Sequence, residues 1–117
     1  MTYVDGFVIA VPTANREAYR ALAEQAAAVF RAHGALSVVE CWGDDVPPGE
    51  VTSFPMAVKC QPDETVVFSW ITWPSREARD AGNAKVMADP RMQMDHAAAP
   101  FDTKRMIFGG FSVLLDA

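Results

Sequence analysis

One carboxyl group, that of Glu40, lies in a segment where it could act as a base. The segment 35–43 (ALSVVECWG) is strand-like, and alternation along a strand puts Glu40 on the same face as Val38 and Trp42. If that face is buried, desolvation raises the pKa of the carboxyl, and Glu40 becomes a candidate general base. If the segment is an exposed edge strand, Glu40 is an ordinary solvated carboxylate. The sequence leaves both interpretations open.

His96 and Arg105 are the two other candidates for catalysis. His96 follows Asp95 in a predicted loop, so an Asp-His pair could shuttle protons, although no nucleophile accompanies it in a recognised motif. Arg105 begins the last predicted strand beside Lys104 and close to Asp102, and these charges could form an anion-binding rim at the mouth of a pocket. The alternative for each residue is an ordinary solvated position.

Large aromatic residues are numerous enough to line a pocket for a flat ligand. Trp42, Trp70 and Phe108 lie in three different predicted strands. We expect them to contact a small apolar or aromatic molecule held between a sheet and its helices. The competing interpretation is structural, because large aromatic side chains also fill cores and subunit interfaces.

The composition argues against several other function classes. The chain has 10 basic and 15 acidic residues, a net charge of −5, and no visible basic patch, which disfavours nucleic-acid binding. Cys41 and Cys60 lack the close paired spacing of a zinc site, and the acidic loop with Asp44, Asp45 and Glu50 matches no calcium-loop template. No phosphate-binding glycine loop or dinucleotide fingerprint occurs. We therefore expect no metal and no cofactor.

Length and hydropathy predict a single cytoplasmic domain spanning residues 1–117. Domains contain about 100 to 200 residues, so a second core would have too little chain. The apolar stretch 106–115 has about half of the roughly 20 residues that a spanning helix needs. The start of the chain lacks the basic segment of a secretory signal, so we expect neither export nor membrane association.

Hydrophobic periodicity and turn residues predict an α+β fold. Strands are expected over 3–11, 35–43, 65–73 and 105–115, and helices over about 14–33 and 75–88. Met56 to Cys60 is also strand-like, which predicts an extra short hairpin strand before the third long strand. This order is the split βαβ pattern of a ferredoxin-like βαββαβ sandwich with an antiparallel sheet.

Both faces of the predicted sheet are apolar. In the first and third long strands, residues of opposite parity are apolar on both sides (Val4, Val8 and Ala10 against Phe7, Ile9 and Val11; Val66, Phe68 and Trp70 against Val67, Ile71 and Trp73). Two helices can cover only one face of such a sheet. We therefore expect a homodimer in which the open sheet faces of two copies cover each other.

Four segments carry a resemblance to a known family. They are VVECWGDDVPPGEVTSFPMAV (38–58), VVFSWITWPSREARDAG (66–82), MADPRM (87–92) and PFDTKRMIFGGF (100–111). Together they resemble the YbaA-like family, domain-of-unknown-function family 1428, of the dimeric α/β-barrel superfamily. Thr103 departs from the PFDGKRM form, in which a glycine stands at that position. The resemblance implies a ferredoxin-like dimer, and it implies no activity.

Two functions follow as hypotheses. The first is a homodimer that binds a small apolar or aromatic molecule in the pocket described above. The second is a cofactor-independent monooxygenase that acts on a planar aromatic substrate, with Glu40 or His96 as the base and Arg105 orienting the substrate. Superfamily relatives include such enzymes as well as haem-degrading ones. The haem-degrading pattern has an Asn on the first strand and a His on the second helix. Here the first strand offers Asp5, and the helix over 76–88 has no His.

Overall fold

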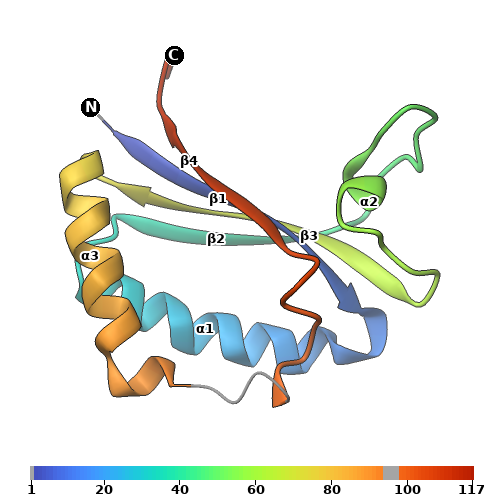
Figure 1. Cartoon of the computed structure of the whole chain (residues 1–117), viewed down its shortest axis with the longest axis horizontal. Coiled ribbons are helices and arrows are strands. Elements are labelled where there is room, and N and C mark those ends of the chain that lie inside the picture. The colour runs from blue at the N-terminus through green and yellow to red at the C-terminus, as the bar shows by residue number, and fades with distance from the viewer. Residues whose placement is uncertain (1, 94–97) are drawn as a thin grey trace.

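The computed structural model describes residues 2–93 and 98–117, and it places α1 and α3 on one side of a four-stranded antiparallel sheet (Figure 1). The strands lie in the order β2-β3-β1-β4, so β2 and β4 form the edges. The elements are β1 Tyr3–Pro12, α1 Arg16–Ala32, β2 Ser37–Trp42, α2 Phe54–Ala57, β3 Glu64–Trp73, α3 Arg76–Ala88 and β4 Ile107–Ser112. This order confirms the predicted α+β class and the βαββαβ connectivity.

The sheet face toward α1 and α3 carries the main core. Alternate residues of β1 and β3 point toward these helices. They form two clusters of buried residues, one of Ile9, Val11, Tyr19 and Val67 and the other of Tyr3, Ala35, Ile71 and Trp73. Helix α1 contributes Tyr19 to the first cluster, so α1 packs against the sheet through its apolar stripe.

Helix α3 lies close to the sheet because Gly82 has no side chain. Gly82 is buried, and a Cβ atom at this position would overlap the ring of Trp73, which is 0% exposed. Beyond the end of α1, Gly34 has a φ of 108°, in the region that favours glycine. Gly82 thus permits the close contact of α3 with the sheet, and Gly34 supplies the positive φ just after α1.

The opposite side of the sheet, called the outer face below, consists of the strand residues that point away from α1 and α3. These are Val4, Gly6, Val8, Ala10, Pro12, Ser37, Val39, Cys41, Glu64, Val66, Phe68, Trp70, Thr72, Ile107, Gly109 and Phe111. The one charged residue among them, Glu64, lies at the end of the sheet and is paired with Arg105. Val58 covers one end by packing on Val8 and Val66. Elsewhere Phe68 remains 44% exposed and Phe111 61% exposed, so the outer face is an apolar surface.

The segment Met56 to Cys60 is not the extra hairpin strand that its composition predicted. Helix α2 occupies its first part, because the Ser53 Oγ accepts a hydrogen bond from the backbone N–H of Met56 at 3.1 Å. Pro55 in the first turn suits a helix start and cannot donate to a sheet ladder. The apolar residue Val58 is buried by packing on the outer face instead of pairing with β3.

Helix α1 is the main element beside the sheet. Its 17 residues extend over about 25 Å and lie below the sheet, roughly along β2 (Figure 1). None of the helices within 2–93 and 98–117 is both long enough and apolar enough to cross a membrane.

Candidate functional site

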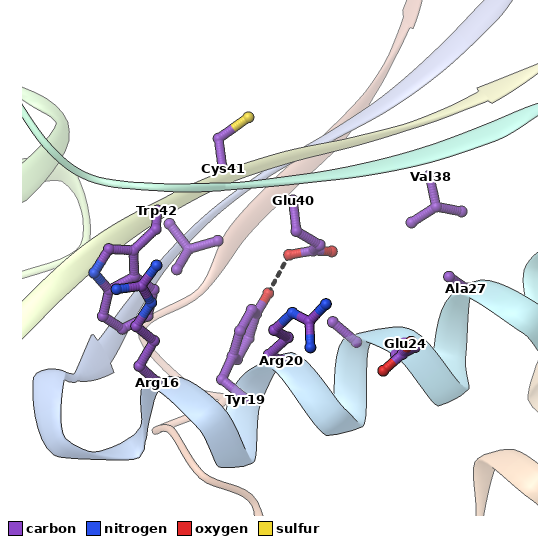
Figure 2. Close-up of a pocket in the computed structure, with 11 residues that line it drawn as sticks. Arg16, Tyr19, Arg20, Glu24, Ala27, Val38, Glu40, Cys41 and Trp42 are labelled. Carbon is purple, nitrogen blue, oxygen red and sulfur yellow. Dashed lines mark hydrogen bonds between the residues drawn. The ribbon is translucent and has the colours of Figure 1, made fainter.

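A cavity of about 360 Å³ lies between α1 and the edge strand β2 (Figure 2). It is lined by Arg16, Tyr19, Arg20, Ala23, Glu24, Ala27, Val38, Glu40, Cys41, Trp42 and Val67. Helix spacing explains one wall, because residues three, four and seven positions apart share a helix face. Strand alternation explains the other, because Val38, Glu40 and Trp42 point to the same side of β2. Cys41 has the opposite parity and directs its thiol away from α1 (Figure 2).

Glu40 and Tyr19 form a hydrogen-bonded pair at the centre of this cavity. The Tyr19 hydroxyl donates to the Glu40 Oε1 at 2.5 Å, joining α1 to β2 (Figure 2). Tyr19 is only 7% exposed, whereas Glu40 keeps an exposed side toward the cavity. The prediction that Glu40 shares a face with Val38 and Trp42 is confirmed, and β2 is also an edge strand. Glu40 thus combines features of both interpretations: an edge position and partial cover by a helix.

The environment shifts the pKa of both groups upward. Desolvation raises the pKa of the Glu40 carboxyl, and the hydrogen bond from Tyr19 opposes that shift. Burial, followed by the nearby Glu40 charge and the shared hydrogen bond, raises the pKa of the Tyr19 phenol far above its usual value. Tyr19 therefore keeps its proton at physiological pH and acts as a donor. Glu40 is the group of the pair that can gain or lose a proton.

Two arginines on α1 give the cavity its positive charge. The Arg16 guanidinium lies over the Trp42 ring, 5.6 Å from the ring centroid, in a cation–π contact. Arg20 follows one helical turn later on the same face and lies near the Tyr19–Glu40 pair (Figure 2). Neither guanidinium has an ion-pair partner among the residues that the structure describes. The cavity therefore offers unpaired cations beside an aromatic ring.

Two of the three aromatic residues expected in one pocket lie outside this cavity. Trp42 lines it, but Trp70 points to the outer face, where its ring lies 5.5 Å from that of Phe68. Phe108 belongs to β4, at the opposite edge of the sheet from β2, and is 71% exposed. Strand parity separates Trp70 from Trp42, and strand order separates Phe108 from both.

Arg105 is held in an ion-pair cluster away from the cavity. Its guanidinium donates to both carboxylate oxygens of Glu64, at 2.7 and 2.6 Å, and also to Asp102 and to the Lys59 carbonyl. These bonds raise the pKa of Arg105 and lower that of Glu64. With its donors already engaged, Arg105 is not an anion-binding rim for this cavity. His96 lies outside the described residues.

Arg16, Tyr19 and Arg20 were not among the site residues that the sequence predicted. In the sequence, Tyr19 belongs to the apolar stripe of α1, so nothing there indicates that its hydroxyl donates a hydrogen bond. Arg16 and Arg20 read as the solvent-facing side of the same helix. The one available signal was their spacing, since residues 16, 19, 20 and 23 share a helix face.

A second polar cluster links β1, β3 and α3. Asp5 is buried and accepts hydrogen bonds from the Trp73 indole N–H at 3.1 Å and from the Arg79 Nε at 3.0 Å. Arg79 also lies over the Tyr3 ring, 5.0 Å from the centroid. These contacts raise the pKa of Arg79 and satisfy the Asp5 carboxylate within the protein. The cluster therefore ties α3 to the sheet.

The acidic loop residues Asp44, Asp45 and Glu50 do not gather around a common point. No group of three or more His, Cys, Asp or Glu side chains in the described ranges is arranged to hold a metal ion.

Comparisons with known proteins define the family. Residues 2–103 match the family described as "Protein of unknown function (DUF1428)". The chain belongs to this family. The "Uncharacterized protein YbaA" of Escherichia coli K12 is 57% identical over 116 residues, covering 99% of both chains, and that of Shigella flexneri is equally similar. The DUF1428 assignment confirms the resemblance seen in the sequence, and it carries no activity with it.

A solved structure supports the fold. The structure of Rv0793 from Mycobacterium tuberculosis superposes with a TM-score of 0.54 and covers 100% of this chain and 99% of its own, at 18% sequence identity. At this identity the likeness concerns the fold alone.

Proposed function

We propose that this DUF1428 protein is a homodimer that binds a small planar aromatic molecule in the cavity between α1 and β2. The observation that carries the proposal is the cavity itself, because it combines a suitable volume with an aromatic and apolar lining. At about 360 Å³ it falls within the usual range for small-molecule sites, roughly 300 to 1,000 Å³. Val38, Ala23 and Ala27 supply apolar walls, and the small alanines leave room for a ring.

Trp42 is the residue that we assign to stacking with the ligand. Its indole lines the cavity and has the exposed Arg16 side chain over its ring, so a flat ligand could take the place of that side chain on the indole. The few polar groups, led by the Tyr19–Glu40 pair, would orient the ligand.

The experiment is a titration with 2-naphthalenemethanol, a neutral aromatic probe, followed by the indole N–H signal of Trp42 in two-dimensional NMR. We expect saturable shifts of this signal in the wild type. Calorimetric titration with the same probe, which needs no indole at position 42, should show loss of binding in Trp42→Ala. The matched control is Phe108→Ala, which removes an exposed aromatic residue outside the cavity and should bind normally. Equal binding by the wild type and Trp42→Ala would refute the assigned site.

The homodimer part of the proposal rests on the outer face. Apart from Glu64, which is paired with Arg105 at one end, its side chains are uncharged, and Phe68, Ile107 and Phe111 are each more than 40% exposed. Contiguous apolar surface of this kind is unfavourable in water and typically marks an interface. A second copy can cover it with the same surface. Light scattering should give about twice the 12.8 kDa chain mass, and Phe68→Glu should reduce it to the monomer mass.

A second candidate function, a cofactor-independent monooxygenase, is favoured by Glu40. This carboxyl lines the cavity, and its raised pKa suits a general base. Glu40 would remove a proton from the acidic CH₂ group of an anthrone-like substrate. Molecular oxygen would then give one oxygen atom to the new carbonyl group and release the other as water. Oxygen uptake with an anthrone should be lost in Glu40→Gln, and equal uptake by the variant would contradict this candidate.

A further inference from the structure

We infer that the cavity between α1 and β2 selects planar aromatic anions, with the ring against Trp42 and the anionic group between Arg16 and Arg20. This inference rests on the proposed function and specifies the class of its ligand. A carboxylate or sulfonate on a flat ring system is the chemistry that would fit.

The first argument is the state of the two arginines. Arg16 and Arg20 lie one turn apart on the same face of α1, where like charges repel each other. Neither is neutralised by a carboxylate within 2–93 and 98–117. By contrast, Arg79 and Arg105 hold carboxylates at 2.9 and 2.6 Å. An anion between Arg16 and Arg20 would relieve their repulsion and accept charge-assisted hydrogen bonds.

The second argument is the position of these charges relative to the aromatic ring. The exposed Arg16 side chain holds its guanidinium 5.6 Å from the centroid of the Trp42 ring, so a ligand ring that stacks on Trp42 would keep this cation within reach of its anionic group. Glu24 lines the same cavity on the next turn of α1 after Arg20. The positive charge is therefore concentrated at the Trp42 end and the Glu24 carboxylate lies toward the other end. This polarity favours a bound orientation in which the anionic group points toward Arg16 and away from Glu24.

The third argument concerns Glu40, the remaining charged group of the cavity. Tyr19 donates its only proton to Glu40, so the pair leaves the second Glu40 oxygen free to face a ligand. A bound anion favours the protonated form of Glu40, which could then donate a hydrogen bond to it. The groups that face Glu40 from α1 are Tyr19, the cations Arg16 and Arg20, and the carboxylate Glu24. Its cross-strand partner on β3 is the uncharged Ser69.

The test compares 2-naphthoate with the neutral 2-naphthalenemethanol by isothermal titration calorimetry at neutral pH. The measured quantity is the ratio of the two affinities. We expect naphthoate to bind at least about tenfold more tightly, a difference of about 1.4 kcal/mol. The Arg16→Gln/Arg20→Gln double variant should lose this preference while its affinity for the neutral probe stays within about twofold. The matched control is Arg31→Gln, a cation in the last turn of α1 that does not line the cavity.

The outcomes separate the two levels of the proposal. Equal affinity for both probes, or a double variant that keeps the preference for naphthoate, overturns the anion inference and leaves aromatic binding standing. Binding of neither probe overturns both. The inference is supported if the preference for naphthoate is lost in the double variant and kept in Arg31→Gln. The role of Glu40 is supported if the affinity for naphthoate rises as pH falls toward about 5.

Discussion

Removal of one hydroxyl group, in Tyr19→Phe, tests the central contact of the cavity. The aromatic ring remains, so the buried apolar area of this 7% exposed residue is unchanged. The variant loses only the 2.5 Å hydrogen bond to Glu40. Hydrogen bonds to charged groups contribute roughly 1.5 to 3 kcal/mol, but Glu40 is exposed on its cavity side and water can replace the phenol. We therefore expect a loss of about 1 kcal/mol.

That loss corresponds to a measurable change in melting temperature. The unfolding entropy of about 2.1 cal/mol/K per residue gives roughly 245 cal/mol/K for this chain, so 1 kcal/mol lowers Tm by about 4 °C. Thermal unfolding followed by circular dichroism at neutral pH is the assay. The second readout is the pKa of Glu40 measured by NMR, which should rise in Tyr19→Phe because the hydrogen bond that lowers it is gone.

Tyr3→Phe is the control for this experiment. Tyr3 is buried like Tyr19, but it lies in β1, belongs to the cluster around Trp73 and forms no hydrogen bond with Glu40. Its removal of a hydroxyl should leave the Glu40 pKa unchanged. If Tyr19→Phe changes neither Tm nor that pKa, the hydrogen bond does not exist in solution and our account of the cavity is wrong.

Three further predictions concern pH, an ion pair and a glycine. Because the folded-state pKa of Glu40 is raised, the protonated carboxyl contributes stability at low pH, and this contribution is lost as pH rises through that pKa. Glu40→Gln has no such loss, so its free energy of unfolding relative to the wild type should increase from about pH 4 to pH 7 in urea titrations. A difference that stays constant with pH would refute this. Arg105→Gln should cost about 2 kcal/mol at neutral pH, since the Glu64 side chain is only 4% exposed and loses its partner. Because the pKa of Glu64 is lowered, this cost should shrink as pH falls below about 4, and a cost independent of pH would contradict the ion pair. Gly82→Ala should cost about 1 to 3 kcal/mol despite the better helix propensity of alanine, because the new methyl group would overlap the buried Trp73 ring; an unchanged melting temperature would show that α3 can move away.

The elements and their faces were predictable because periodicity is a local property. The alternation of Val38, Glu40 and Trp42 placed them on one face, and the stripe of α1 placed Tyr19 toward the sheet. The order and class of the long elements followed from the same patterns. The exception was α2, where the cap formed by Ser53 outweighed the strand-like composition of the residues after it.

The composition of the site was harder to predict because it depends on tertiary contacts. The Tyr19–Glu40 bond joins residues 21 positions apart and forms only because α1 packs over an edge strand. The separation of Trp42 from Trp70 depends on the register of β2, in which Trp42 lies opposite Val67. Parity within a single strand cannot supply that register. Charged residues such as Arg16 also look alike in sequence whether they face a cavity or bulk water.

The three tryptophans occupy three distinct environments, and this gives the protein a set of built-in optical reporters. Trp73 is in the core, Trp42 is in the cavity, and Trp70 is on the outer face. Variants that retain a single indole would emit at wavelengths set by these surroundings. Fluorescence from Trp73 would report on unfolding, from Trp42 on ligand occupancy, and from Trp70 on association between subunits. Each event could thus be followed separately without attaching a dye.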